Sequence, residues 1–111
     1  MIELHFSQKN PQVGDVKITL RVIGSNLYFK FSASSYADQV IAQLSSRGAK
    51  IEKGNGWIRV DMFSNKMGQG QQVFKLGDKE IDFEEDTASQ IESKLADFYR
   101  IQYVKAGFSI E

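Results

Sequence analysis

The chain has 111 residues, of which 41% are hydrophobic and 25% charged, a composition typical of a folded domain rather than a disordered segment. Fourteen Lys and Arg residues balance fourteen Asp and Glu residues, so the net charge points neither to a nucleic-acid-binding protein nor to an acidic mimic. The absence of cysteine excludes disulfides, thiolate metal sites and cysteine nucleophiles, and it fits a reducing compartment.

From the N-terminal segment we expect no signal peptide. Residues Met1 to Phe6 alternate between apolar and polar side chains and lack the basic and apolar regions of a signal peptide. No run of 18 apolar residues occurs, so we expect no transmembrane helix and no membrane partner. The sequence therefore predicts a cytoplasmic protein, with residues 1–111 forming a single α+β domain.

Alternating apolar residues predict three strands in the first third of the chain, at residues 2–7, 16–22 and 27–31. The turn residues Gly24-Ser25-Asn26 predict that the second and third strands form a hairpin. After Ser34 the apolar residues recur at helical spacing instead, and Gly48 is typical of a helix end. We expect a helix near 35–47.

The second half of the chain returns to strands. A short strand from Ile51 precedes a β-rich, alternating segment at 57–63. Residues 64–71 have no apolar periodicity, which predicts a loop that is either functional or an ordinary connector.

Two further strands, at 73–76 and 79–83, flank Gly77-Asp78, a two-residue turn with glycine first, as the type II′ turn prefers. Residues 84–87, of which the first three are acidic, then predict the start of a second helix, which ends at Gly107. Beyond it, Phe108 and Ile110 either cap the core or form a short final strand.

These elements follow the order β-β-β-α-β-β-β-β-α. Hairpin-linked strands with only two helices favour the α+β class. We expect a mostly antiparallel sheet with both helices packed on one face.

No catalytic or metal-binding motif is visible. His5 is the only histidine and is predicted to be a solvent-facing strand residue. The adjacent acids Glu84, Glu85 and Asp86 fit helix-end charge better than a cation site. The glycine-containing segment 68–71 lacks the third glycine of a dinucleotide loop and precedes a strand. We therefore expect no cofactor, although an enzyme whose carboxylates meet only on folding stays open.

One face of the predicted sheet combines cations with aromatic rings. It collects Lys17, Thr19, Arg21, Tyr28, Lys30, Trp57, Arg59 and Phe63. Such residues also occur on ordinary half-solvated strand faces. Large exposed aromatic residues, however, are characteristic of interaction sites. The candidate binding residues are Trp57, Tyr28, Arg59, Lys30, Arg21 and Phe63, with Lys66 and Met67 from the 64–71 loop.

Three functions fit this pattern. The first is a small non-enzymatic protein that binds another protein, or its own copy as a homodimer, with Trp57 and Tyr28 as anchors. The second is single-stranded nucleic-acid binding on the same face, against which the balanced charge and nearby acidic residues count. The third is a small-molecule site between sheet and helices, lined by Tyr99, Gln102 and Tyr103.

Overall fold

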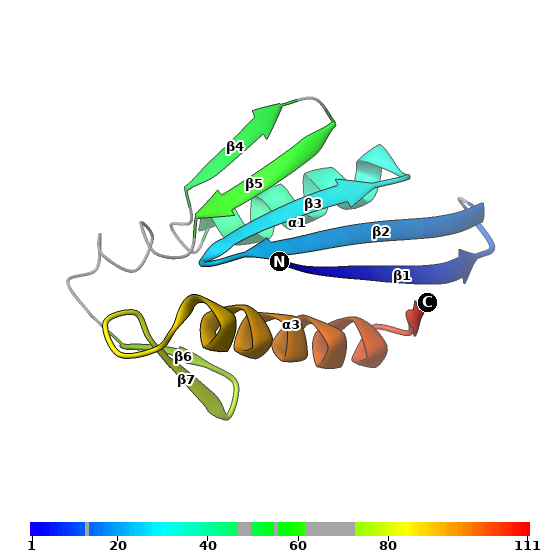
Figure 1. The fold of residues 1–111 in the computed structure, drawn as a ribbon. Coiled ribbons are helices and arrows are strands. Elements are labelled where there is room, and N and C mark those ends of the chain that lie inside the picture. Colours follow the sequence, from blue (N-terminus) through cyan, green and yellow to red (C-terminus); the bar gives the residue numbers. More distant parts are fainter. Residues whose placement is uncertain (13, 47–49, 55, 62–72) are drawn as a thin grey trace.

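The computed structural model describes residues 1–12, 14–46, 50–54, 56–61 and 73–111, which form an α+β fold (Figure 1). Its elements are β1 (Ile2–Asn10), β2 (Gly14–Ile23), β3 (Asn26–Phe31), α1 (Ser34–Ser46), β4 (Ile51–Gly54), β5 (Trp57–Asp61), β6 (Val73–Leu76), β7 (Lys79–Asp82), α3 (Ala88–Lys105) and β8 (Ser109–Ile110). The predicted class and element order are confirmed, and β8 supplies the short final strand.

Six strands form one antiparallel sheet in the order β4-β5-β3-β2-β1-β8. The first three strands are neighbours joined by short turns, as their alternation predicts. Asn26 pairs with Ile23 as part of β3, so the predicted three-residue turn is a two-residue turn at Gly24-Ser25. The chain then passes through α1 before β5 pairs with β3.

The alternating apolar residues of β1, β2, β3 and β5 are buried on the helix side of the large sheet, as the period of two requires. The buried core residues are Leu4, Phe6, Val16, Ile18, Leu20, Val22, Leu27, Phe29, Ile58, Val60, Leu76, Ile81, Ile91, Leu95, Ala96 and Phe108. Tyr36 of α1 and Tyr103 of α3 both contact the ring of Phe108, so the two helices cover the same face of the sheet. The opposite face, called the outer face below, carries the polar members.

The β6–β7 hairpin forms a separate two-stranded sheet instead of extending the large one. Figure 1 shows α3 between this hairpin and the six-stranded sheet, and α3 contacts β1, β2 and β7. Gly77 has a φ of 67°, which its two-residue turn requires and which glycine adopts without strain. The buried Leu76 and Ile81 give the hairpin its apolar contacts.

The start of the second helix differs from the prediction. The helix begins at Ala88 after the N-cap Thr87, so Glu84, Glu85 and Asp86 precede it. The Thr87 hydroxyl accepts the N–H of Gln90 at 3.2 Å, and the Gln90 side chain accepts the N–H of Thr87 at 2.8 Å. This capping box fixes the helix start because it satisfies two backbone donors locally.

Candidate functional site

A row of directly opposed residues crosses the outer face from one strand to the next. Arg21 of β2 lies opposite Glu3 of β1 and Tyr28 of β3. Arg59 of β5 lies opposite Tyr28 and Glu52 of β4. The structure therefore brings together the predicted residues Arg21, Tyr28 and Arg59, which come from three strands, and places an acidic residue at each end of the row.

Trp57 lies beside this row and is half-buried. The Arg21 guanidinium carbon lies 4.7 Å from the centroid of its ring, and the Lys30 ammonium lies 5.9 Å from it. Both cations lie within the distance at which the negative face of an aromatic ring attracts positive charge. Five predicted residues from β2, β3 and β5 thus form one aromatic and basic cluster: Arg21, Tyr28, Lys30, Trp57 and Arg59.

Carboxylates neutralise both arginines of this cluster. Arg21 Nε donates to Glu3, and Arg59 Nη1 donates to Glu52 at 3.0 Å, with Asp61 at 3.6 Å from Arg59 Nη2. The hydrogen bond from Arg21, and then that from His5, lower the pKa of Glu3 below its usual value. The hydrogen bond to Glu52 raises the pKa of Arg59. The face therefore offers less free positive charge than its residue types indicate.

His5 occupies the predicted position on the outer side of β1. Its Nε2 lies 3.1 Å from a Glu3 carboxylate oxygen, and its side chain is exposed. Among the described residues, no group of three or more His, Cys, Asp or Glu side chains is arranged to hold a metal ion. Within the same part of the chain, no helix combines the length and apolar character needed to cross a membrane.

Two hollows flank the β4–β5 hairpin. The outer hollow, of about 330 Å³, is lined by Tyr28, Glu52, Lys53, Gly54, Trp57 and Arg59. The α1 hollow, of about 410 Å³, lies between α1 and the hairpin and is lined by Phe31, Ser34, Ala37, Asp38, Ile41, Lys53, Gly54, Gly56, Trp57 and Ile58. Trp57 borders both hollows, so it joins the outer face to the helix side of the sheet.

Three predicted binding residues cannot be placed. Phe63, Lys66 and Met67, together with the rest of the 64–71 loop, lie outside the described residues. The candidate site is therefore defined by the cluster around Trp57 and by the two hollows.

The residues predicted to line a small-molecule site near the end of α3 have different surroundings. The ring centroid of Tyr99 lies 5.5 Å from that of Phe29, and that of Tyr103 lies 4.8 Å from that of Phe6. Burial raises the pKa of Tyr103 well above its usual value. Gln102 instead lines a hollow of about 290 Å³ between α3 and the β6–β7 turn. Both tyrosines thus pack into the core between sheet and helix.

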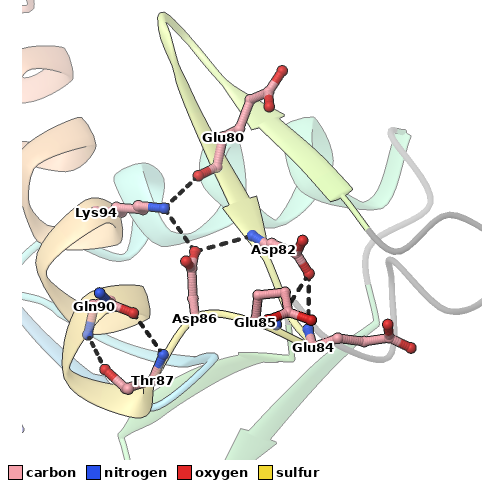
Figure 2. A network of polar contacts seen from close by, with 8 residues as sticks. All are labelled: Glu80, Asp82, Glu84, Glu85, Asp86, Thr87, Gln90 and Lys94. Atoms are coloured by element: carbon pink, nitrogen blue, oxygen red, sulfur yellow. Dashed lines mark hydrogen bonds and ion pairs between the residues drawn. The ribbon is translucent and has the colours of Figure 1, made fainter.

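The acidic segment before α3 forms a polar network that the sequence pattern did not reveal (Figure 2). Lys94 donates to the Asp86 carboxylate and to the Glu80 carbonyl, both at 2.7 Å. Asp86 also accepts the N–H of Asp82 at 3.0 Å. The hydrogen bond from Lys94, followed by that from Asp82, lowers the pKa of Asp86.

Asp82 completes this network by accepting the N–H groups of Glu84 and Glu85, at 3.0 and 3.2 Å. The acidic segment is thus a structural turn that ties β7 to α3, rather than charge on the first helical turn. The spacing Thr87-x-x-Gln90 was the sequence feature that could have placed the helix start correctly.

Known protein families, curated proteins and solved structures, compared with the chain, gave no match.

Proposed function

We propose that this protein is a small non-enzymatic binding module that recognises another protein, or a second copy of itself, through the outer face around Trp57. The observation that carries the proposal is the position of Trp57, which is half-buried beneath Arg21 and borders hollows on both sides of the sheet. Tryptophan, tyrosine and arginine dominate the binding energy of protein interfaces. Here all three gather in one cluster.

The charges of this cluster support a protein partner over single-stranded nucleic acid. Stacked bases need aromatic rings, but the phosphate backbone also needs free cations. Arg21 and Arg59 are each paired with a carboxylate, so a phosphate would have to displace Glu3, Glu52 or Asp61. A protein surface can instead meet both signs of charge across one interface.

Rigid geometry adds to this support. Arg21, Tyr28 and Arg59 lie on adjacent positions of three hydrogen-bonded strands, so their backbones cannot move independently. A preorganised cluster lowers the entropy that binding must overcome. The Arg21 and Lys30 side chains further restrict the orientation of the Trp57 ring.

The proposal is tested by capture from a lysate, with and without nuclease treatment, using tagged wild-type protein, a Trp57→Ala variant and a Val104→Ala variant. Val104 is an exposed apolar residue on α3 and serves as the control, being 52% exposed. We expect a protein that wild type and Val104→Ala retain and Trp57→Ala loses. A captured protein retained equally by all three would contradict the role of Trp57, and material lost on nuclease treatment would favour nucleic acid.

A further inference from the structure

The free edge of β4 offers backbone hydrogen-bonding groups beside the Trp57 cluster. β4 ends the six-stranded sheet, and no described strand pairs with its outer side. The Asp61 N–H donates to the Lys50 carbonyl at 3.4 Å, which sets the phase of the β4–β5 ladder. Along two antiparallel strands, opposed residues that hydrogen-bond to each other alternate with opposed residues that do not. Ile51 and Lys53 therefore direct their N–H and C=O groups away from β5.

The two hollows lie on opposite faces of the sheet at this edge. Lys53, Gly54 and Trp57 contribute to the lining of both. Successive side chains of an extended peptide point to opposite faces. A strand added to β4 would therefore place alternate side chains over the outer hollow and in the α1 hollow, which is the arrangement that gives strand addition its specificity.

Glycine at position 54 keeps the edge of the cluster open. Gly54 pairs with Trp57 at the end of the hairpin, and a Cβ built on Gly54 meets no atom within 4 Å. No side chain of β4 stands between the Trp57 ring and an incoming strand at this position. A partner side chain opposite Gly54 can thus reach Trp57.

The hollows and their charges indicate what kind of segment fits. The α1 hollow has apolar walls that include Phe31, Ile41 and Ile58. On the outer face, the Lys30 ammonium lies 5.9 Å from the centroid of the Trp57 ring, and the β4–β5 register places Lys50 on the same side as Glu52. Neither ammonium makes an ion pair with a described residue, whereas the carboxylates of Glu52 and Asp61 are paired with Arg59. Of these four described side chains, the two that make no ion pair are both cations.

We propose that the partner binds by adding an extended, acidic segment to β4. An apolar side chain of the segment enters the α1 hollow, and its acidic neighbours lie over the outer face near Lys30 and Lys50. This inference rests on the proposed function because Trp57 serves both. It adds a main-chain component that the outer face alone does not require.

A displayed library of random peptides, selected against the full chain, tests this binding mode. We expect enriched peptides in which acidic residues alternate with apolar ones. Lys53→Pro removes one N–H that faces away from β5, and edge strands tolerate proline at such a position. This variant should weaken binding about tenfold or more. Lys53→Ala keeps the N–H and should weaken it by no more than about fivefold.

The outcomes separate this inference from the proposed function. Peptides that lose affinity for Trp57→Ala but bind Lys53→Pro as well as wild type would overturn strand addition and leave the outer face as the site. Peptides indifferent to both variants, or no enriched peptide at all, would also overturn it. If the protein alone forms dimers and Lys53→Pro abolishes them, the edge of β4 binds a second copy of the chain. That result would contradict binding of an acidic partner.

Hydrogen–deuterium exchange provides a measurement that needs no variant. Binding of an enriched peptide should slow exchange at the amides of Ile51 and Lys53, which face away from β5. The amide of Glu52 already bonds within the sheet and serves as the internal control. Unchanged exchange at Ile51 and Lys53 in the saturated complex would contradict strand addition even if the proline variant failed to fold.

Discussion

The guanidinium of Arg21 lies 4.7 Å from the centre of the Trp57 ring, although strand β3 separates the strands that carry the two residues. The contact crosses the outer face diagonally. It shields one face of the ring while leaving Trp57 at the border of two hollows. A residue held in this way is both ordered and accessible, which suits an interface anchor.

Arg21→Ala should therefore change the environment of Trp57. The chain has one tryptophan, so its fluorescence reports this site alone. We expect emission at longer wavelength, greater quenching by acrylamide, and a loss of stability of about 0.5–1 kcal/mol. Arg100→Ala is the matched control, since Arg100 pairs with Asp97 on α3 away from the ring. Identical spectra for both variants would show that Arg21 does not cover Trp57 in solution.

The capping box at the start of α3 gives a second prediction. Thr87→Ala removes the hydroxyl that accepts the Gln90 N–H and should lower the free energy of unfolding by about 1 kcal/mol. Thr87→Ser keeps this acceptor and should be nearly neutral. Chemical denaturation measures both, and equal loss in the two variants would contradict the capping role.

The network of Figure 2 should control how firmly the β6–β7 hairpin is held. Lys94→Met removes the ammonium that joins Asp86 to the Glu80 carbonyl. We expect faster amide exchange in β7, including at Asp82, whose N–H donates to Asp86. Lys17→Met, on strand β2, removes an ammonium that lies outside this network and should leave exchange in β7 unchanged. No difference between the variants would show that other contacts hold the hairpin.

Stability should fall in acid. The pKa of Asp86 is lowered chiefly by Lys94, that of Asp97 by Lys79, and that of Glu92 by the N–H of Gly24. A carboxyl whose pKa is lower in the folded state stabilises the protein above its unfolded pKa. That contribution is lost as the pH falls through the folded pKa.

The melting temperature should thus be nearly constant from pH 7 to about 5 and decrease below about pH 4, where unfolded carboxyls take up protons. Thermal unfolding followed by circular dichroism across this range measures the effect. Glu92→Gln, at the buried carboxyl, should reduce the slope. A melting temperature that rises in acid would contradict the assignment of these ion pairs and hydrogen bonds.

The sequence predicted the strands because the apolar residues at every second position are the ones that the fold buries. Leu4 and Phe6 are buried while Glu3 and His5 face solvent, as a period of two requires. The spacing of glycine and polar residues also predicted the turn at Gly77. These features depend on neighbours in the chain, so a single sequence is enough to find them.

Long-range relationships were not predictable in the same way. The contact between Arg21 and Trp57 depends on β5 pairing with β3 after the passage through α1, and alternation carries no information on strand order. The buried Glu92 likewise depends on the Gly24 turn, whose N–H donates to its carboxylate at 2.9 Å. The predicted face was thus correct for Arg21, Tyr28 and Arg59, but its hollows and ion pairs required the structure.

The central claim is that Trp57 anchors a protein partner. Its most direct test is the affinity of a captured partner for wild type and Trp57→Ala, measured by calorimetry at low and physiological salt. We expect the substitution to cost about 2 kcal/mol or more, roughly a thirtyfold loss of affinity, with modest dependence on salt. Equal affinity for the two proteins, with the variant shown to be folded, would contradict the claim.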